Sequence, residues 1–258
     1  MLAYVATMRT TISYILVSLL FVGVAHAKPE TVFVLRDLDS GQERGVDASM
    51  ADRPFLPYST FKIPNTLIGL ETGVIPDEKF TLKWDGKKYA NEAWNHDQDL
   101  ASALHESVVW FYQEVARRIG PERMAAWLHK LRYGNEKSTP MIDRFWLDGE
   151  LRITPRQQVD FLARMAKQQL PVSAEHVALL RRLLTLQKDG DCVLQGKTGT
   201  GKDSGEAWLV GFFDTPRHHL AYAYLTTGGL SVSREERVRS VVEGLKARGV
   251  YAGCRTQP

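Results

Sequence analysis

The sequence predicts a mixed α/β (α+β) fold, in which an antiparallel sheet is flanked by helices and an all-helical subdomain is inserted into the chain between its strands. Three observations predict it: strand-like alternation just after residue 30, helical periodicity through the middle, and strand patterns again after Gly190. The two ends of the chain are therefore expected to build one sheet together.

The first strand pattern predicts a hairpin. Residues 31–35 alternate and are rich in β-branched side chains, residues 39–42 supply turn residues, and the strand pattern resumes at residues 45–46. The mature protein is therefore expected to begin with two paired strands.

The middle of the chain is expected to be helical. Apolar residues recur there at helical spacing, and Gly73 and Gly120 stand where the first two helices should end. Pro64 comes early in the first helix, near the turn where proline is tolerated. The expected helices cover residues 59–71, 100–119, 122–131, 155–167 and 174–186.

Strand patterns return in the last part of the chain, and a final amphipathic helix follows them. The expected strands cover residues 193–200, 207–213 and 220–226, and the helix covers residues 233–248. We expect one domain over residues 28–258. Its mixed subdomain would combine residues 28–57 with 187–258, and its helical subdomain would cover residues 58–186.

Residues 1–27 have the pattern of a cleavable signal peptide. Arg9 is their one formal charge, an apolar run covers residues 12–24, and Ala25-His26-Ala27 ends the segment. About 13 apolar residues fall short of the roughly 20 that span a bilayer, which disfavours a transmembrane anchor. We therefore expect export to the periplasm, with no membrane association after cleavage.

The charge balance disfavours a nucleic-acid partner. Removing residues 1–27 lowers the formal net charge from +3 to +2 and leaves 231 residues. This mild excess, without a run of Lys and Arg, does not indicate nucleic-acid binding. With 44% hydrophobic and 24% charged residues, the composition is that of a globular protein rather than a disordered one.

Two cysteines, Cys192 and Cys254, would enter an oxidising compartment, where a pair can form a disulfide. Their separation of 62 residues says nothing about their distance in space. A disulfide and two unpaired thiols therefore both stay open. No metal-ligand spacing accompanies the cysteines and the seven histidines are scattered, so no metal site is expected.

A serine and a lysine stand three residues apart at the start of the first expected helix. Ser59 and Lys62 would project from one helix face, because residues three apart are neighbours there. A serine becomes a good nucleophile when a neighbour takes its proton, and a helix N-terminus offers N–H groups to a developing oxyanion. An ordinary N-cap serine beside an exposed lysine fits the same short pattern, so the pattern alone is weak.

Lys197, Thr198 and Gly199 lie on an expected strand that follows the helical region. A glycine there leaves room for a ligand, while the lysine and threonine offer a cation and a hydroxyl to a substrate carboxylate. A Ser-x-x-Lys pair followed by Lys-Thr-Gly is typical of β-lactamases and penicillin-binding proteins. The triplet therefore strengthens the case that Ser59 and Lys62 are catalytic.

Five motifs, in this order, resemble those of the class D β-lactamases. They are Ser59-Thr60-Phe61-Lys62, Ser107-Val108-Val109, Tyr133-Gly134-Asn135, Phe145-Trp146-Leu147 and Lys197-Thr198-Gly199. The resemblance covers nearly all of the mature chain. It implies a β-lactamase/transpeptidase-like fold and hydrolysis of the β-lactam ring of penicillins and related antibiotics, and hence antibiotic resistance.

The second motif separates this chain from related families. Class A β-lactamases and most transpeptidases carry an asparagine where Val109 stands, and the loop around Trp146 lacks the Glu-x-x-x-Asn arrangement of class A. A different base is therefore required. Residues 207–212 depart from the class D pattern, in which Gly-Trp and a final Trp are more usual, so the substrate range stays open.

The resemblance implies that Lys62 is carboxylated by carbon dioxide and acts as the general base of both acylation and deacylation. Only a neutral amine attacks carbon dioxide, and a lysine with its ordinary pKa of about 10.4 is almost entirely charged at pH 7. Burial must therefore lower the pKa of Lys62, and we expect Phe61, Val109, Phe145 and Trp146 to surround it. No cofactor beyond carbon dioxide or bicarbonate is implied.

Further roles follow from the same resemblance. The indole N–H of Trp146 would bind the carbamate, and Val109 would help to seal the pocket. Ser107 would relay protons between Lys197 and the leaving nitrogen. The Tyr133-Gly134-Asn135 turn would shape the site, with Gly134 at positive φ.

The resemblance also implies the groups that would bind substrate. The backbone N–H groups of Ser59 and Thr200 would form the oxyanion hole. Thr198, Ser107 and an arginine of the last helix would hold the substrate carboxylate. Arg237 is preferred over Arg234, because counting from Arg237 places the following leucine, glycine and apolar pair where the family has them.

Two other functions are compatible with parts of the pattern. β-Lactam sensor domains share the serine and the lysine but acylate once and then signal. They are tethered behind several membrane spans, whereas this sequence shows one cleavable segment. A cell-wall transpeptidase would carry Ser-x-Asn. The expected partners are therefore β-lactams, and the protein is expected to be a monomer or a homodimer.

Overall fold

The computed structural model describes residues 30–44, 48–138, 141–201, 204–228, 232–251 and 254. The expected signal peptide lies outside these residues, as does the segment 45–46 that was expected to resume the first hairpin. Within the described ranges, no helix is long and apolar enough to cross a bilayer.

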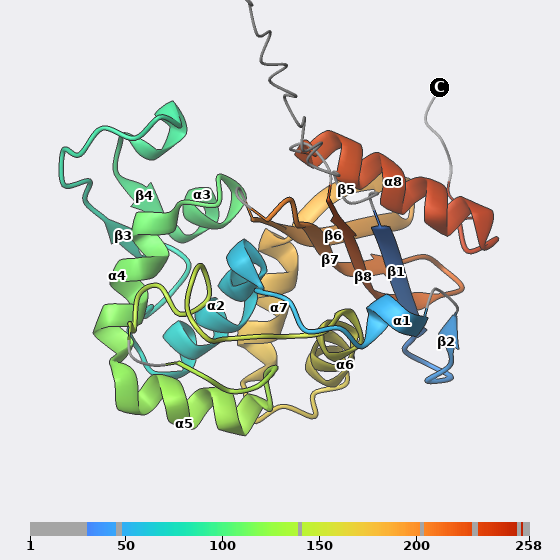
Figure 1. Ribbon diagram of the computed structural model, residues 1–258, viewed down its shortest axis with the longest axis horizontal. Coiled ribbons are helices and arrows are strands. Elements are labelled where there is room, and N and C mark those ends of the chain that lie inside the picture. The colour runs from blue at the N-terminus through green and yellow to red at the C-terminus, as the bar shows by residue number, and fades with distance from the viewer. Residues whose placement is uncertain are drawn as a thin grey trace, which may run out of the picture.

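A six-stranded antiparallel sheet forms one half of the molecule (Figure 1). The strand order is β2-β1-β8-β7-β6-β5. The strands are β1 (Glu30–Asp37), β2 (Glu43–Arg44), β5 (Thr185–Asp189), β6 (Cys192–Thr200), β7 (Ala207–Asp214) and β8 (His219–Thr227). Because β1 pairs with β8, both ends of the chain build one sheet, which confirms the expected fold class.

Helices cover both faces of this sheet. Along β1 the side chains alternate, so Val32 and Val34 join the core beneath α6 (Pro155–Ala166), and Phe33 and Leu35 join the core beneath α8 (Arg234–Ala247). Figure 1 shows α8 lying across the outer face of the sheet. The sheet is thus the middle layer between α8 and the helical half.

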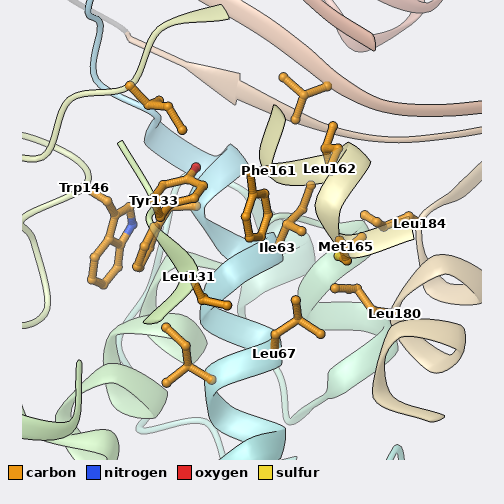
Figure 2. Packing of buried hydrophobic residues seen from close by; sticks show 14 of the residues in the cluster. Ile63, Leu67, Leu131, Tyr133, Trp146, Phe161, Leu162, Met165, Leu180 and Leu184 are labelled. Carbon is orange, nitrogen blue, oxygen red and sulfur yellow. The ribbon is translucent and has the colours of Figure 1, made fainter. Parts of the chain in front are cut away.

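The helical half surrounds one central helix, α2 (Lys62–Glu71), in which every residue from Lys62 to Leu70 is buried. In Figure 2, Ile63 and Leu67 of α2 point into a cluster with Phe161, Met165 and Leu180. The other elements here are η1 (Tyr58–Phe61), η2 (Glu92–Trp94), α3 (Leu100–His105), α4 (Val109–Ile119), α5 (Pro121–Leu131), α7 (Ala174–Leu183), β3 (Thr81–Leu82) and β4 (Gln98–Asp99). The short helix α1 (Ala48–Ala51) lies instead beside β1 of the sheet (Figure 1). A helix buried all round gives its residues fixed positions.

Two of the expected helices are wrong in extent. The expected helix over residues 100–119 is two helices, α3 and α4, because Ser107 between them adopts a left-handed conformation with φ of 59°. The expected helix over residues 174–186 ends at Leu183, and β5 begins at Thr185. The break at Ser107 turns this residue out of a helix interior and toward the sheet.

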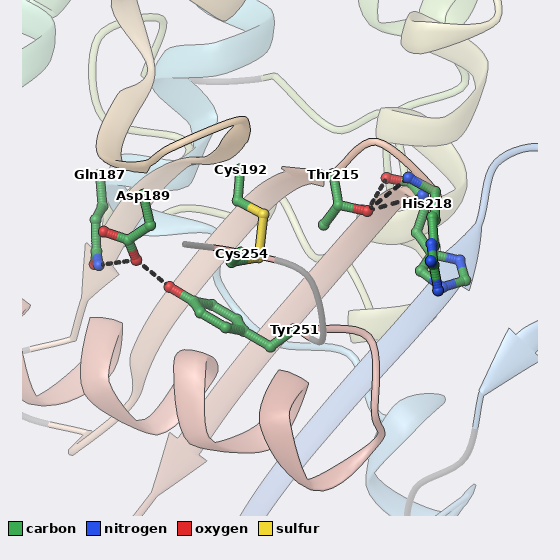
Figure 3. The surroundings of a disulfide bond; sticks show 8 residues. Gln187, Asp189, Cys192, Thr215, His218, Tyr251 and Cys254 are labelled. Carbon is green, nitrogen blue, oxygen red and sulfur yellow. Dashed lines mark hydrogen bonds between the residues drawn. A yellow bond between two sulfur atoms is a disulfide. The ribbon is translucent and has the colours of Figure 1, made fainter. Parts of the chain in front are cut away.

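A disulfide joins Cys192, at the start of β6, to Cys254, beyond the end of α8 (Figure 3). It answers the question that the sequence left open. It also links the strand that carries Lys197 to the C-terminal segment after α8.

Removal of this disulfide is expected to lower the free energy of unfolding by about 2 to 4 kcal/mol. A cross-link that closes a loop of this length restricts the unfolded chain more than the folded one. Urea unfolding of the double variant Cys192→Ser/Cys254→Ser, beside the oxidised wild type, measures the difference. A loss below about 0.5 kcal/mol would contradict the expectation.

Candidate active site

Ser59 and Lys62 meet at the junction between η1 and α2. Ser59 lies within η1, and Lys62 is the first residue of α2. Nζ of Lys62 donates a hydrogen bond to Oγ of Ser59 at 2.9 Å. The structure therefore brings the expected nucleophile and base into direct contact.

Lys62 is fully buried, and burial lowers its pKa to about 7. Phe61, the residue before Lys62, stacks on Trp146 at 5.2 Å between ring centroids and meets the edge of Phe145 at 5.0 Å. Val109, at the start of α4, is only half-buried. Near neutral pH, a large fraction of Lys62 is therefore an uncharged amine.

Trp146 lies beside Tyr133 next to α2, as Figure 2 shows. Its side chain is fully buried, and its carbonyl oxygen accepts a hydrogen bond from the N–H of Tyr58 at 3.0 Å. Within the described part of the chain, the indole N–H of Trp146 has no hydrogen-bond partner. A buried donor of this kind favours binding of an oxygen acceptor at that position.

Lys197, on β6, reaches the site from the sheet. Its Nζ donates to Oγ of Ser107 at 3.0 Å and to the carbonyl oxygen of Thr198 at 3.2 Å. Burial holds the pKa of Lys197 well below its ordinary value, and the charges of Lys62, Arg234 and Arg237 act in the same direction. Ser107 and Lys197, 90 residues apart in sequence, thus form one hydrogen-bonded pair.

Gly199 allows β6 to lie directly against η1. A Cβ at this position would stand 2.7 Å from the carbonyl oxygen of Pro57 and 3.2 Å from the backbone nitrogen of Thr60. Any side chain here would push the strand away from the turn that carries Ser59. Gly199 therefore sets the separation of β6 from Ser59.

The two candidate arginines both lie beside β6. The guanidinium group of Arg237 is buried and donates to the carbonyl oxygen of Gly199 at 3.0 Å and to Oγ1 of Thr200 at 2.9 Å. Arg234 is half-buried and lines a small recess together with Lys197 and Thr198. The structure thus places Arg237 at the end of the strand and Arg234 nearer to Lys197.

Tyr133-Gly134-Asn135 packs against the turn of the nucleophile. Tyr133 meets the ring of Phe61 at 5.8 Å and donates to Oε1 of Gln158 at 3.3 Å. Gln158 in turn donates to Oγ1 of Thr60 at 2.8 Å. Gly134 has φ of 58°, as expected, and a Cβ there would stand 2.2 Å from the carbonyl oxygen of Arg152.

Sequence reasoning missed Tyr112. Its ring centroid lies 5.2 Å from Nζ of Lys62, and its hydroxyl group is hydrogen-bonded to that of Thr66 at 2.9 Å. In the sequence, Tyr112 belongs to the apolar stripe of an amphipathic helix, where a tyrosine has the pattern of an ordinary core residue. The sequence pattern therefore did not indicate that Tyr112 lies beside Lys62.

Comparisons with known proteins agree with this geometry. Residues 19–241 match a protein family described as "Penicillin binding protein transpeptidase domain". The chain is 40% identical over 220 residues to the "Probable beta-lactamase YbxI" of Bacillus subtilis (strain 168), covering 84% of this chain and 80% of that protein. It is 38% identical over 198 residues to "Beta-lactamase OXA-10" of Pseudomonas aeruginosa, covering 75% of this chain and 74% of that protein.

Solved structures show the same similarity. The crystal structure of a class D β-lactamase from Bacillus subtilis matches with a TM-score of 0.81 and 37% identity, covering 87% of this chain and 94% of that chain. The family match over residues 19–241 includes every motif residue from Ser59 to Arg237.

Proposed function

Because the chain belongs to the class D β-lactamases, we propose that it opens the β-lactam ring of penicillins and related antibiotics through an acyl-enzyme on Ser59, and so confers antibiotic resistance. The observation that carries this proposal is the 2.9 Å contact between Ser59 and a fully buried Lys62 with a pKa of about 7. A serine activated by a neutral amine or by its carbamate has the chemistry that acyl transfer requires.

Acylation begins at the hydroxyl group of Ser59. Lys62 takes the hydroxyl proton while Oγ attacks the carbonyl carbon of the β-lactam, so that a C–O bond forms and the ring C–N bond then breaks. The Ser59–Lys62 contact lies within the reach that direct proton transfer needs. The negative charge that develops on the carbonyl oxygen would be held by the backbone N–H groups of Ser59 and Thr200.

The leaving ring nitrogen needs a proton when its bond to carbon breaks. Ser107 would donate its hydroxyl proton and recover one from Lys197, to which it is hydrogen-bonded at 3.0 Å. The lowered pKa of Lys197 supports this role, because a proton leaves such an amine more readily near neutral pH.

Deacylation needs a base that activates water. We propose that Lys62 is already carboxylated before acylation: the free amine adds to carbon dioxide and loses one proton to solvent, and the resulting carbamate on Nζ is the base in both steps. Carboxylated Lys62 then takes a proton from water, whose oxygen attacks the ester, and Ser59 recovers its proton as the ester C–O bond breaks. The low pKa of Lys62 and the buried, unpartnered indole N–H of Trp146 among the described residues both support this modification.

Substrate is proposed to lie along β6. Thr198, Ser107 and Arg237 would hold its carboxylate, Gly199 would let it approach the strand, and Val109 would cover the lysine. The hydrogen bonds of Arg237 to Gly199 and Thr200 support a place at the end of that strand.

Arg237→Ala is expected to raise KM for penicillins by about 10- to 100-fold and to raise it much more than Arg234→Ala does, because a lost carboxylate contact weakens ground-state and transition-state binding alike. Steady-state kinetics of both variants measure the difference. Thermal unfolding of each variant separates lost binding from lost folding, since Arg237 also bonds to the backbone.

A β-lactam whose carboxylate is esterified provides the matched control. Its KM should change little in Arg237→Ala, because it has no anion for the guanidinium group to bind. A larger effect of Arg234→Ala would transfer the role to Arg234, and equal effects would contradict the preference for Arg237.

Turnover separates the proposed enzyme from a sensor that acylates once. The purified protein, mixed with a large excess of a chromogenic cephalosporin or a penicillin, should release many molecules of hydrolysed product for each protein molecule. Release that stops after one equivalent would contradict the proposal and favour the sensor.

We further propose that residues 1–27 direct export and are then removed, so that hydrolysis takes place in the periplasm. The charge and apolar pattern of this segment support the proposal. N-terminal sequencing of the protein recovered from a periplasmic extract tests it, with residue 28 expected as the first residue.

A further inference from the structure

Tyr58, immediately before the nucleophile, has an unusual backbone conformation. Its φ is 47°, in the left-handed region that large side chains rarely adopt and that costs about 1 to 3 kcal/mol. The side chain is nevertheless buried, with 8% of its surface exposed. Contacts of this side chain must therefore offset the strain.

Among the described residues, the hydrogen bonds of the Tyr58 hydroxyl group lead to residues between β6 and β7. Its hydroxyl group donates to Oε2 of Glu206 at 2.6 Å and lies 2.8 Å from Oγ of Ser204. Ser204 also donates to the same carboxylate oxygen. We call these three residues, Tyr58, Ser204 and Glu206, the clasp.

Gly201 makes room for the clasp. A Cβ at this position would stand 2.5 Å from the hydroxyl oxygen of Tyr58 and 2.6 Å from the ring carbon that bears it. The turn is closed by hydrogen bonds from the N–H of Gly201 to the carbonyl oxygen of Glu206 at 2.9 Å, and from the N–H of Gly205 to that of Gly201 at 3.1 Å. The turn and the ring are thus fitted to each other.

The clasp connects the two sides of the proposed oxyanion hole. Tyr58 is bonded to Ser59, and Gly201 is bonded to Thr200, so the two N–H donors lie directly next to the joined segments. Tyr58 also donates its own N–H to the carbonyl oxygen of Trp146. Movement of either segment would change the separation of the two donors.

We propose that the clasp holds the N–H groups of Ser59 and Thr200 at the separation that the tetrahedral intermediate requires, which makes Tyr58 and Glu206 positioning residues. This inference rests on the proposed function. Burial and the neighbouring carboxylate raise the pKa of Tyr58 to about 12, so its hydroxyl group remains a donor at every pH at which the enzyme would work. The clasp therefore acts as a fixed support rather than a pH-dependent switch.

Two conservative variants alter this hydrogen bond and keep the shape: Tyr58→Phe removes the donor, and Glu206→Gln replaces the charged acceptor with a neutral, weaker one. Each is expected to lower kcat by roughly 5- to 50-fold and to change KM less than about twofold, because the oxyanion contact is stronger in the transition state than in the ground state. The double variant should lose no more than the worse single variant, since both act on the same interaction.

Tyr251→Phe is the matched control. Tyr251 also donates to a carboxylate, that of Asp189. This pair lies near the disulfide between Cys192 and Cys254, as Figure 3 shows. The control should leave kcat unchanged even where its thermal stability falls as much as that of Tyr58→Phe. An equal loss of kcat in the control would mean that stability alone explains the effect, and would overturn the proposal.

Infrared spectroscopy of the acyl-enzyme provides a direct measurement. With a slowly hydrolysed β-lactam carrying a carbon-13 label, the ester carbonyl stretch should move to higher wavenumber in Tyr58→Phe and Glu206→Gln but stay in place in Tyr251→Phe, because a looser oxyanion hole polarises the carbonyl less.

An unchanged kcat and an unchanged carbonyl stretch in both clasp variants would overturn the clasp and leave the proposed function standing. A wild-type protein that neither turns over β-lactams nor forms an ester would overturn the proposed function, and the clasp with it.

Discussion

Ser59→Ala is expected to abolish β-lactam hydrolysis, lowering kcat/KM by at least about 10⁴-fold, because the covalent ester cannot form without the serine oxygen. The fold should remain intact. Ser59 makes no side-chain cap at the start of η1 or α2, and among the described residues its hydroxyl group accepts a hydrogen bond from Lys62. Steady-state kinetics and thermal unfolding of the variant measure both effects.

Ser40→Ala is a suitable control for this variant. It removes one serine hydroxyl from the exposed turn between β1 and β2, on the sheet half of the molecule. It should leave kcat/KM unchanged. Hydrolysis that persists in Ser59→Ala would contradict the proposed mechanism, because the reaction would then use a nucleophile other than Ser59.

Activity is expected to fall about tenfold between pH 8 and pH 6 and to be partly restored by added bicarbonate. The pKa of Lys62 is about 7. Below that pH the amine is protonated, and an ammonium group neither adds to carbon dioxide nor accepts the serine proton. As the pH rises through 7, the neutral amine becomes the main form, and bicarbonate shifts the equilibrium toward the carbamate by mass action.

Trp146→Ala should exaggerate both the acid loss and the response to bicarbonate, because it removes the indole N–H and apolar cover from the region of Lys62. Trp127→Ala, which truncates a half-buried tryptophan of α5, is the control and should follow the wild-type profile. Carbon-13 NMR with labelled bicarbonate should show a carbamate signal that is absent from Lys62→Ala. Full activity in degassed buffer at about pH 6, without this signal, would mean that Lys62 acts as a plain amine.

Local pattern predicted most of the fold, because alternation and helical spacing are local properties of the sequence. The strands β6, β7 and β8 begin and end within about one residue of the expected limits. Ser107 shows where this reasoning fails. The apolar residues before and after it keep helical spacing, so the sequence predicted one continuous helix, whereas its left-handed conformation depends on distant contacts. The hydrogen bond to Lys197, on the sheet, is one of those contacts.

The site was predictable to the extent that its parts are close in sequence. Ser59 and Lys62 share a turn, so their spacing alone brought them together. The contact between Ser107 and Lys197 could be predicted only from the resemblance of the ordered motifs to a known family, because no spacing rule relates residues that far apart in sequence. Tyr58 gave no signal, because a tyrosine is among the residues least expected at positive φ.

Rapid-quench mass spectrometry tests the central claim, that Ser59 forms an ester which water then cleaves, most directly. The protein mixed with a penicillin should gain the mass of one intact penicillin molecule within the first turnover, and peptide mapping should place the adduct on Ser59. Its rates of appearance and decay should account for kcat. An adduct on another residue, an adduct that persists without decay, or turnover with no adduct at any time would contradict the proposed mechanism.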